Sequence, residues 1–69
     1  MVINLRAARI NAGFTQTEAV SALNKKGVKI SRNTLASYEK YKTQPDIETA
    51  KAMSELYGLS LDEIIFFKN

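Results

Sequence analysis

The sequence predicts an all-α fold in which five short helices form one domain over residues 1–69. Apolar residues recur at helical spacing, and the three glycines, Gly13, Gly27 and Gly58, each follow such a segment, where a left-handed helix cap favours glycine. No alternation typical of a strand is longer than residues 28–30. A chain of this size buries only about 60% of its unfolded surface. Because it has no cysteine or histidine, its support must come from packing, helix caps or a partner subunit.

The first two helices are predicted over residues 3–12 and 15–26. Leu5, Ala8 and Ala12 give the first helix its apolar face. Thr15 and Glu18 stand at the spacing of a capping box, in which each side chain accepts a hydrogen bond from the backbone of the other, so the second helix begins there.

A third helix is predicted over residues 31–41, after a short extended link and with Ser31 as its N-cap. Leu35 and Tyr38 face one way, toward a core. The opposite side carries short polar groups flanked by cations: Arg32, Asn33, Ala36, Ser37 and Lys40. Such a face fits the edges and phosphates of a DNA groove, and it fits water equally well.

The last two helices are predicted beyond Pro45, which forbids continuation of the third. Asp46 caps a fourth helix over Ile47–Tyr57, in which Ile47 is expected to point inward. A second capping box at residues 60–63 predicts a fifth helix, with Leu61, Ile64 and Ile65 inward and two phenylalanines after it.

Charge divides the chain into two unlike halves. Eight of the ten Lys and Arg lie in residues 1–42, against two Glu, whereas residues 43–69 hold two Lys and five Asp or Glu. A polyanion would be drawn to the basic half. The alternative is a mixed, solvated surface, and the lysines at positions 25, 26 and 29 are more simply a solvated cluster.

Several classes of protein are disfavoured. The acidic residues lie at predicted helix caps, and there is no histidine, cysteine or glycine-rich phosphate loop, so we expect no enzyme, metal or cofactor. No apolar run is long enough to span a membrane, and no signal-peptide segment is present, so we expect no membrane partner and a cytoplasmic location.

In order and spacing these features resemble the phage Cro/repressor-type helix-turn-helix family, also described as xenobiotic-response-element-like DNA-binding domains. The resemblance covers nearly the whole chain. It rests on the runs Leu5-x-x-Ala8-Arg9, Gly13-Phe14-Thr15-Gln16-x-Glu18, Ile30-Ser31-Arg32-Asn33-Thr34-Leu35-x-x-Tyr38-Glu39-Lys40, Pro45-x-Ile47-Glu48-Thr49 and Leu56-x-Gly58-Leu59-Ser60-Leu61-Asp62-Glu63.

The resemblance implies a lambda-repressor-like domain whose second and third helices form the helix-turn-helix, and it implies roles for matching residues. The positions that match readers of base edges are Arg32, Asn33 and Ser37. The positions that match contacts to the DNA backbone are Gln16, Thr17, Ser31, Lys40, Lys42 and Thr43. Arg9 and Glu39 match a partly buried salt bridge between the first and third helices.

Plainer roles stay open for some of these residues. Gln16 can be an ordinary helix residue, Arg32 can grip phosphate instead of a base, and Ser37 can simply be solvated. The Arg9–Glu39 pair can be a weak surface pair worth about 0–1 kcal/mol. Tyr38 is most simply a core aromatic.

The function implied is that of a sequence-specific regulator of transcription that occupies a double-stranded DNA operator, in a bacterial cell or phage-infected host, without a small-molecule ligand. We expect a homodimer, at least on DNA, because one half-site offers few contacts. The apolar residues expected at its interface are Leu59, Ile65, Phe66 and Phe67. The alternative is a helical protein-interaction module, or an antitoxin-type subunit, that uses this apolar end.

Three departures from the family pattern leave local geometry open. The segment between Leu23 and Ser31 is longer than the usual link, so either helix or turn must absorb the extra residues. Ala19-Val20 stands where a large and then a small residue is usual. Tyr41 stands where glycine often ends the third helix, and a left-handed tyrosine would cost about 1–2 kcal/mol.

Overall fold

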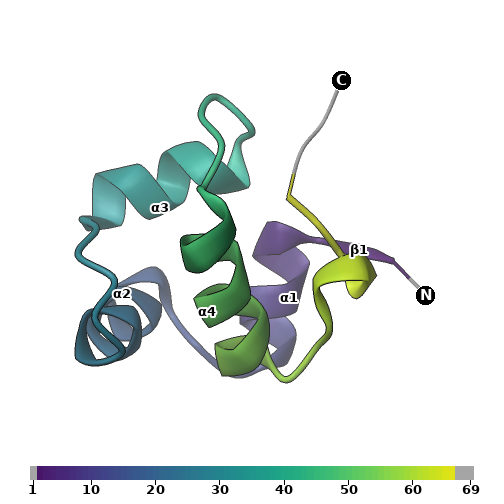
Figure 1. Ribbon diagram of the computed structural model, residues 1–69, viewed down its shortest axis with the longest axis horizontal. Helices are drawn as coiled ribbons and strands as arrows, with labels where there is room; N and C mark the ends of the chain where they lie inside the picture. Colours follow the sequence, from purple (N-terminus) through teal and green to yellow (C-terminus); the bar gives the residue numbers. More distant parts are fainter. Residues whose placement is uncertain (1, 67–69) are drawn as a thin grey trace.

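The computed structural model describes residues 2–66. Four α-helices follow one another: α1 (Leu5–Asn11), α2 (Gln16–Lys25), α3 (Arg32–Glu39) and α4 (Ile47–Tyr57). In Figure 1, α4 lies in front, α3 at the upper left, α2 below it, and α1 behind α4. The helical character predicted from the sequence is therefore present. None of the helices within residues 2–66 combines the length and the apolar character needed to cross a bilayer.

The predicted fifth helix is wrong. Residues 61–63 form only a single 3-10 turn, η1 (Leu61–Glu63), which the short strand β2 (Ile64–Ile65) follows. β2 pairs in parallel with β1 (Ile3–Asn4), with Ile3 opposite Ile64. The Ser60–Glu63 capping box starts the turn, but two consecutive β-branched isoleucines favour an extended backbone, and β1 supplies a hydrogen-bonding partner.

The first helix begins two residues later than predicted. The side chain of Asn4 accepts a hydrogen bond from the Ala7 N–H at 2.7 Å, so Asn4 is the N-cap and α1 starts at Leu5. Ile3 is consequently free to extend and pair with β2. At the other end the helix stops at Asn11, which leaves Ala12 exposed and not, as predicted, on the inner face.

The core is built from one or two large side chains per helix. Leu5, Leu23, Leu35 and Met53 are completely buried, and Ala8, Ala19 and Ala50 lie among them at positions where a larger side chain would separate the helices. Ile64 and Phe66 complete the core from the C-terminal segment. Two residues predicted to face inward are exposed instead. Ile47, at the first position of α4, is 60% exposed, and Ile65, on β2, is 36% exposed.

The long link between α2 and α3 is rebuilt as a capped turn. Val28 donates its N–H to the Leu23 carbonyl at 2.9 Å and Gly27 to Asn24 at 3.0 Å, with Gly27 at a φ of 95°. This pattern is a Schellman cap, which requires a left-handed residue after the helix. The Asn24 side chain then accepts the Ile30 N–H at 3.3 Å, so the extra residues are fastened back to α2.

Candidate nucleic-acid interface

The first turn of α3 presents its polar side chains to solvent. Ser31 caps the helix by accepting the Thr34 N–H at 3.2 Å, and Arg32 and Asn33 beyond it are exposed. Leu35 is completely buried on the opposite side. Ser37, one turn further on, is half-buried. The predicted reading face is therefore most accessible at its N-terminal end.

The N-terminus of α2 carries the predicted capping box. Thr15 Oγ1 accepts the Glu18 N–H at 3.1 Å, and Glu18 Oε1 accepts the Thr15 N–H at 2.9 Å. Two of the four unpaired N–H groups that a helix start leaves are satisfied in this way. Among residues 2–66, none accepts from the N–H groups of Gln16 and Thr17, and both residues line a surface hollow. Free N–H groups at a helix N-terminus are suited to bind an anion.

A buried network connects three helices below this surface. Arg9 Nε donates to Glu39 Oε2 at 2.6 Å and Nη2 to Oε1 at 3.2 Å. The two side chains are 8% and 3% exposed, so this is a buried two-point pair and not a surface contact. Gln16 Nε2 adds a bond to Glu39 Oε1 at 3.1 Å, and Arg9 Nη1 donates to the Phe14 carbonyl at 2.9 Å. The network fixes the positions of α1, α2 and α3 relative to one another.

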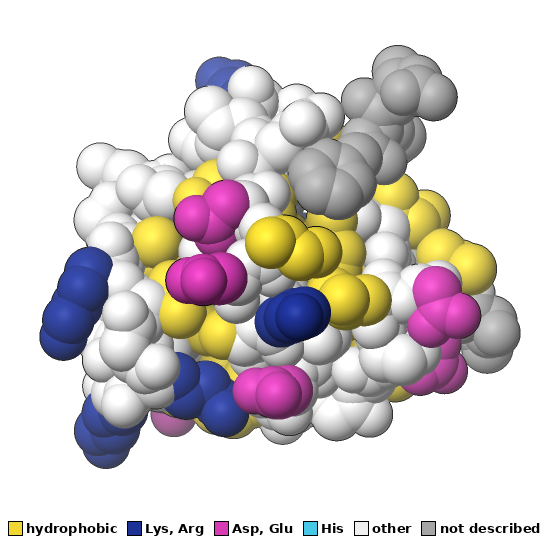
Figure 2. Space-filling view, in the orientation of Figure 1, with side chains coloured by type: hydrophobic (Ala, Val, Ile, Leu, Met, Phe, Trp, Pro, Cys, Tyr) yellow, Lys and Arg dark blue, Asp and Glu magenta, His cyan; other side chains and the backbone are white. Residues whose placement is uncertain are grey.

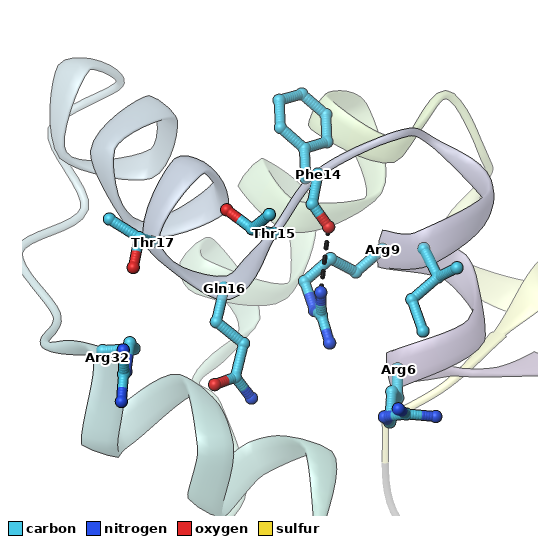
Figure 3. Close-up of a pocket in the computed structure, with 8 residues that line it drawn as sticks. Arg6, Arg9, Phe14, Thr15, Gln16, Thr17 and Arg32 are labelled. Atoms are coloured by element: carbon cyan, nitrogen blue, oxygen red, sulfur yellow. Dashed lines mark hydrogen bonds between the residues drawn. The ribbon is translucent and has the colours of Figure 1, made fainter.

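An open hollow of about 590 Å³ lies over this network (Figure 3). Among the described residues its lining holds three arginines, three polar residues, two apolar residues and no acidic side chain: Arg6, Arg9, Ile10, Phe14, Thr15, Gln16, Thr17 and Arg32. In Figure 3, Gln16 projects between Arg32, on α3, and Arg6, on α1. Because Glu39 neutralises Arg9, Arg6 and Arg32 are the lining cations that favour an anion here.

A second hollow, of about 430 Å³, continues along α1 toward the end of α3. Arg6 and Ile10 line both hollows, and Lys40 and Tyr41 line the second. Lys42 and Thr43 are exposed in the loop beyond but line neither hollow. Sequence reasoning missed Arg6. Its position one helical turn before Arg9 is the signal that could have placed it near the same surface.

The residues predicted to form a dimer interface differ in how exposed they are. Ile65 is 36% exposed and Leu59 is half-buried. Phe66 is only 4% exposed because it packs into the core of its own chain, so it does not stand on the surface as predicted. Phe67 lies outside the described residues. Up to residue 66, therefore, the apolar surface at this end is smaller than the sequence indicated.

The face that carries α4 has a different character. Figure 2 shows hydrophobic side chains there, interrupted by both basic and acidic groups. Lys26 pairs with Glu55 at 3.7 Å, with both side chains substantially exposed, and such a pair contributes about 0–1 kcal/mol. Lys51 lies near Glu48 and Glu55 along a separate hollow. The mixed charge makes this face a poorer surface for a polyanion than the one formed by α1, α2 and α3.

Three groups near the helix–helix contacts have shifted pKa values. Hydrogen bonds from the side chain and N–H of Thr49 lower the pKa of Asp46, the cap of α4. Burial, with Asp46 nearby, raises the pKa of Tyr38. Burial also raises the pKa of Tyr57, beside Glu39, and within residues 2–66 the buried Tyr57 hydroxyl has no hydrogen-bond partner. None of these side chains lines the first hollow.

Comparison with known proteins agrees with this geometry. Residues 5–64 match the family model described as helix-turn-helix. The chain is also 39% identical over 61 residues to the HTH-type transcriptional regulator ImmR of Bacillus subtilis (strain 168). That match covers 88% of this chain and 44% of the length of the relative. No solved structure matches significantly. The chain belongs to the phage Cro/repressor-type helix-turn-helix family.

Proposed function

We propose that this chain binds double-stranded DNA sequence-specifically and regulates transcription by occupying an operator. The observation that carries the proposal is the pairing of an exposed, capped first turn of α3 with an adjoining basic hollow. The family membership and the regulator named among its relatives support the same function.

In this proposal α3 enters the major groove by its N-terminal end. Arg32 can donate two hydrogen bonds to guanine, and Asn33 can form a two-point contact with adenine. Both side chains are exposed and stand at the first two positions of the helix. Ser37, which is half-buried, contributes a shorter contact deeper along the same face.

The flanking residues would hold the DNA backbone. Gln16 and Thr17, whose N–H groups have no acceptor within residues 2–66, line the first hollow, and a phosphate there would suit the helix N-terminus. Gln16 uses one amide hydrogen on Glu39 and keeps the second for a phosphate. Further hydroxyl and ammonium groups for the backbone come from four exposed residues at and beyond the two ends of α3: Ser31, Lys40, Lys42 and Thr43.

We also propose that two copies bind a two-fold symmetric site, with half-sites about 34 Å apart. Ile65 and Leu59 remain the candidates for the contact between copies, since Phe66 is occupied in the core.

The test is selection of bound duplexes from a random-sequence pool, followed by a salt titration of the recovered duplex. We expect a consensus with two-fold symmetry, and a logarithm of affinity that falls by about 0.9 per phosphate contact for each tenfold rise in salt. Failure to enrich any sequence, together with a flat salt dependence on the unselected pool, would rule out DNA binding and favour a protein-interaction module.

A further inference from the structure

Arg6 is an exposed cation that the predicted site does not use. It is the second residue of α1 and lines the hollow that α1 shares with α2 and α3. Within residues 2–66 its guanidinium makes no ion pair and no hydrogen bond, in contrast to Arg9 one turn later, which is fully engaged by Glu39 and Phe14. An unpaired guanidinium keeps all of its donors for a ligand.

The position of Arg6 connects two regions that the predicted contacts leave separate. The first hollow contains the N-terminus of α2, with Gln16 and Thr17, and the second contains Lys40 at the end of α3. Arg6 and Ile10 are the side chains that line both hollows. A polyanion that follows the surface from one hollow to the other therefore passes Arg6.

Charge in the second hollow does not oppose this passage. Glu39 lines it, but the Glu39 carboxylate accepts bonds from Arg9 and Gln16 and its side chain is only 3% exposed. The accessible charged side chains that line the second hollow are those of Arg6 and Lys40, and both residues are exposed. Ile10, which is 47% exposed between the hollows, offers an apolar contact of the kind that a deoxyribose ring can accept.

We propose that Arg6 binds a DNA phosphate between the contact at the N-terminus of α2 and the contact at Lys40, so that α1 takes part in DNA binding. The proposal rests on the proposed function and adds to it a contact from a helix outside the helix-turn-helix. A guanidinium suits this role because its planar fork can hold two oxygens of one phosphate.

The experiment compares Arg6→Gln with a control of equal charge change. Lys51→Gln removes one exposed positive charge from α4. Lys51 lines a hollow that shares no residue with the two hollows described above, so it is a suitable control. Affinity for the selected duplex is measured by fluorescence anisotropy over a range of salt concentrations. A scrambled duplex of the same length shows whether the contact depends on sequence, and circular dichroism melting checks that each variant folds.

We expect Arg6→Gln to reduce the salt slope by about 0.9, because one phosphate contact is lost. Taken alone, this counterion effect weakens binding about fivefold at 0.15 M salt and about fifteenfold at 0.05 M, on both duplexes. Lys51→Gln should leave the slope unchanged. Arg6→Lys keeps the charge and should keep the slope, and a slope as low as that of Arg6→Gln would contradict a phosphate contact made through this charge.

Two results would overturn the inference. One is an equal effect of Arg6→Gln and Lys51→Gln on the salt slope. That result would mean that Arg6 acts only through the net charge of the protein and makes no phosphate contact. The other is a loss that appears only on the selected duplex, which would make Arg6 a reader of bases. A wild-type protein without salt-dependent binding would contradict the proposed function itself, so the two failures are distinguishable.

Discussion

The hydroxyl of Tyr41 donates a hydrogen bond to the carbonyl of Ile65 at 2.6 Å, across 24 residues of chain. The same oxygen accepts the Leu5 N–H at 3.2 Å. Tyr41, the second residue after α3, has a left-handed φ of 61°, and the Lys42 N–H completes the cap by donating to the Ser37 carbonyl at 3.0 Å. A position that usually favours glycine is therefore occupied by a side chain that ties α3 to α1 and β2.

Substitutions at Tyr41 should distinguish the cost of its left-handed backbone from the contribution of its two hydroxyl hydrogen bonds. Tyr41→Phe keeps the ring and the left-handed backbone but loses both hydroxyl bonds, so we expect a loss of about 1–3 kcal/mol in the free energy of unfolding. Tyr41→Gly relieves about 1–2 kcal/mol of strain but also loses the bonds and the ring, so it should not exceed the wild type. Urea unfolding measures both. A phenylalanine variant as stable as the wild type would show that the hydroxyl contributes nothing.

The buried pair should respond strongly to loss of its carboxylate. Glu39→Gln leaves the Arg9 charge without a counter-ion at a site that is 8% exposed, so we expect destabilisation by about 3–5 kcal/mol. Glu55→Gln is the matched control, because Glu55 is 72% exposed and its pair with Lys26 is long. There the change should stay below about 1 kcal/mol. Equal effects at the two positions would contradict the structural role given to Glu39.

The two ends of α3 should affect DNA binding in different ways. Asn33→Ala removes a two-point base contact, so discrimination at one base position should weaken by about 1–3 kcal/mol. Lys40→Ala removes a phosphate contact, so all sequences should bind more weakly and the salt slope should fall by about one. Competition binding with single-base variants of the selected duplex measures the first effect, and a salt titration measures the second. If Asn33→Ala preserves every base preference, Asn33 does not read the groove.

Stability should decline in acid partly through Asp46. The folded-state pKa of Asp46 is lowered, so its contribution is complete above the pKa of the unfolded chain and is lost as pH falls through the folded pKa. Hydrogen bonds from Ser60 lower the pKa values of Asp62 and Glu63 in the same direction. We expect the melting temperature to fall below about pH 4.5. Asp46→Asn, which can still cap the helix, should fall less steeply over this range. Parallel curves for the two proteins would exclude Asp46 as a contributor.

Local signals account for the parts of the fold that the sequence predicts well. The four α-helices and the caps at Thr15, Ser31 and Asp46 depend on residues within one turn of each other, so periodicity and spacing are sufficient to find them. The β1–β2 pair is different, because it joins segments about sixty residues apart and each strand has only two residues. No local pattern distinguishes Ile64-Ile65 in a strand from the same pair on a helix.

The candidate site follows the same division. The exposure of Asn33 follows from helical phase once Leu35 is assigned to the core, whereas Arg32, one turn before Leu35, is exposed because it stands at the first position of the helix. The burial of Phe66 and the position of Arg6 between two hollows depend on how separate elements pack, which phase alone does not give. The left-handed Tyr41 belongs to this second group as well, since its hydroxyl partners come from both ends of the fold.

The parallel direction of β1 and β2 has a mechanical consequence. Pulling residue 2 and residue 66 in opposite directions would slide the two strands past each other, so their slanted hydrogen bonds would be loaded together and not one after another. The bond from Tyr41 to Ile65 joins the same point, so force applied there is carried directly to the end of the helix that we propose lies on DNA. In a single-molecule stretching experiment, the force of the first unfolding event should be the force that breaks the β1–β2 pair and the bond from Tyr41 to Ile65.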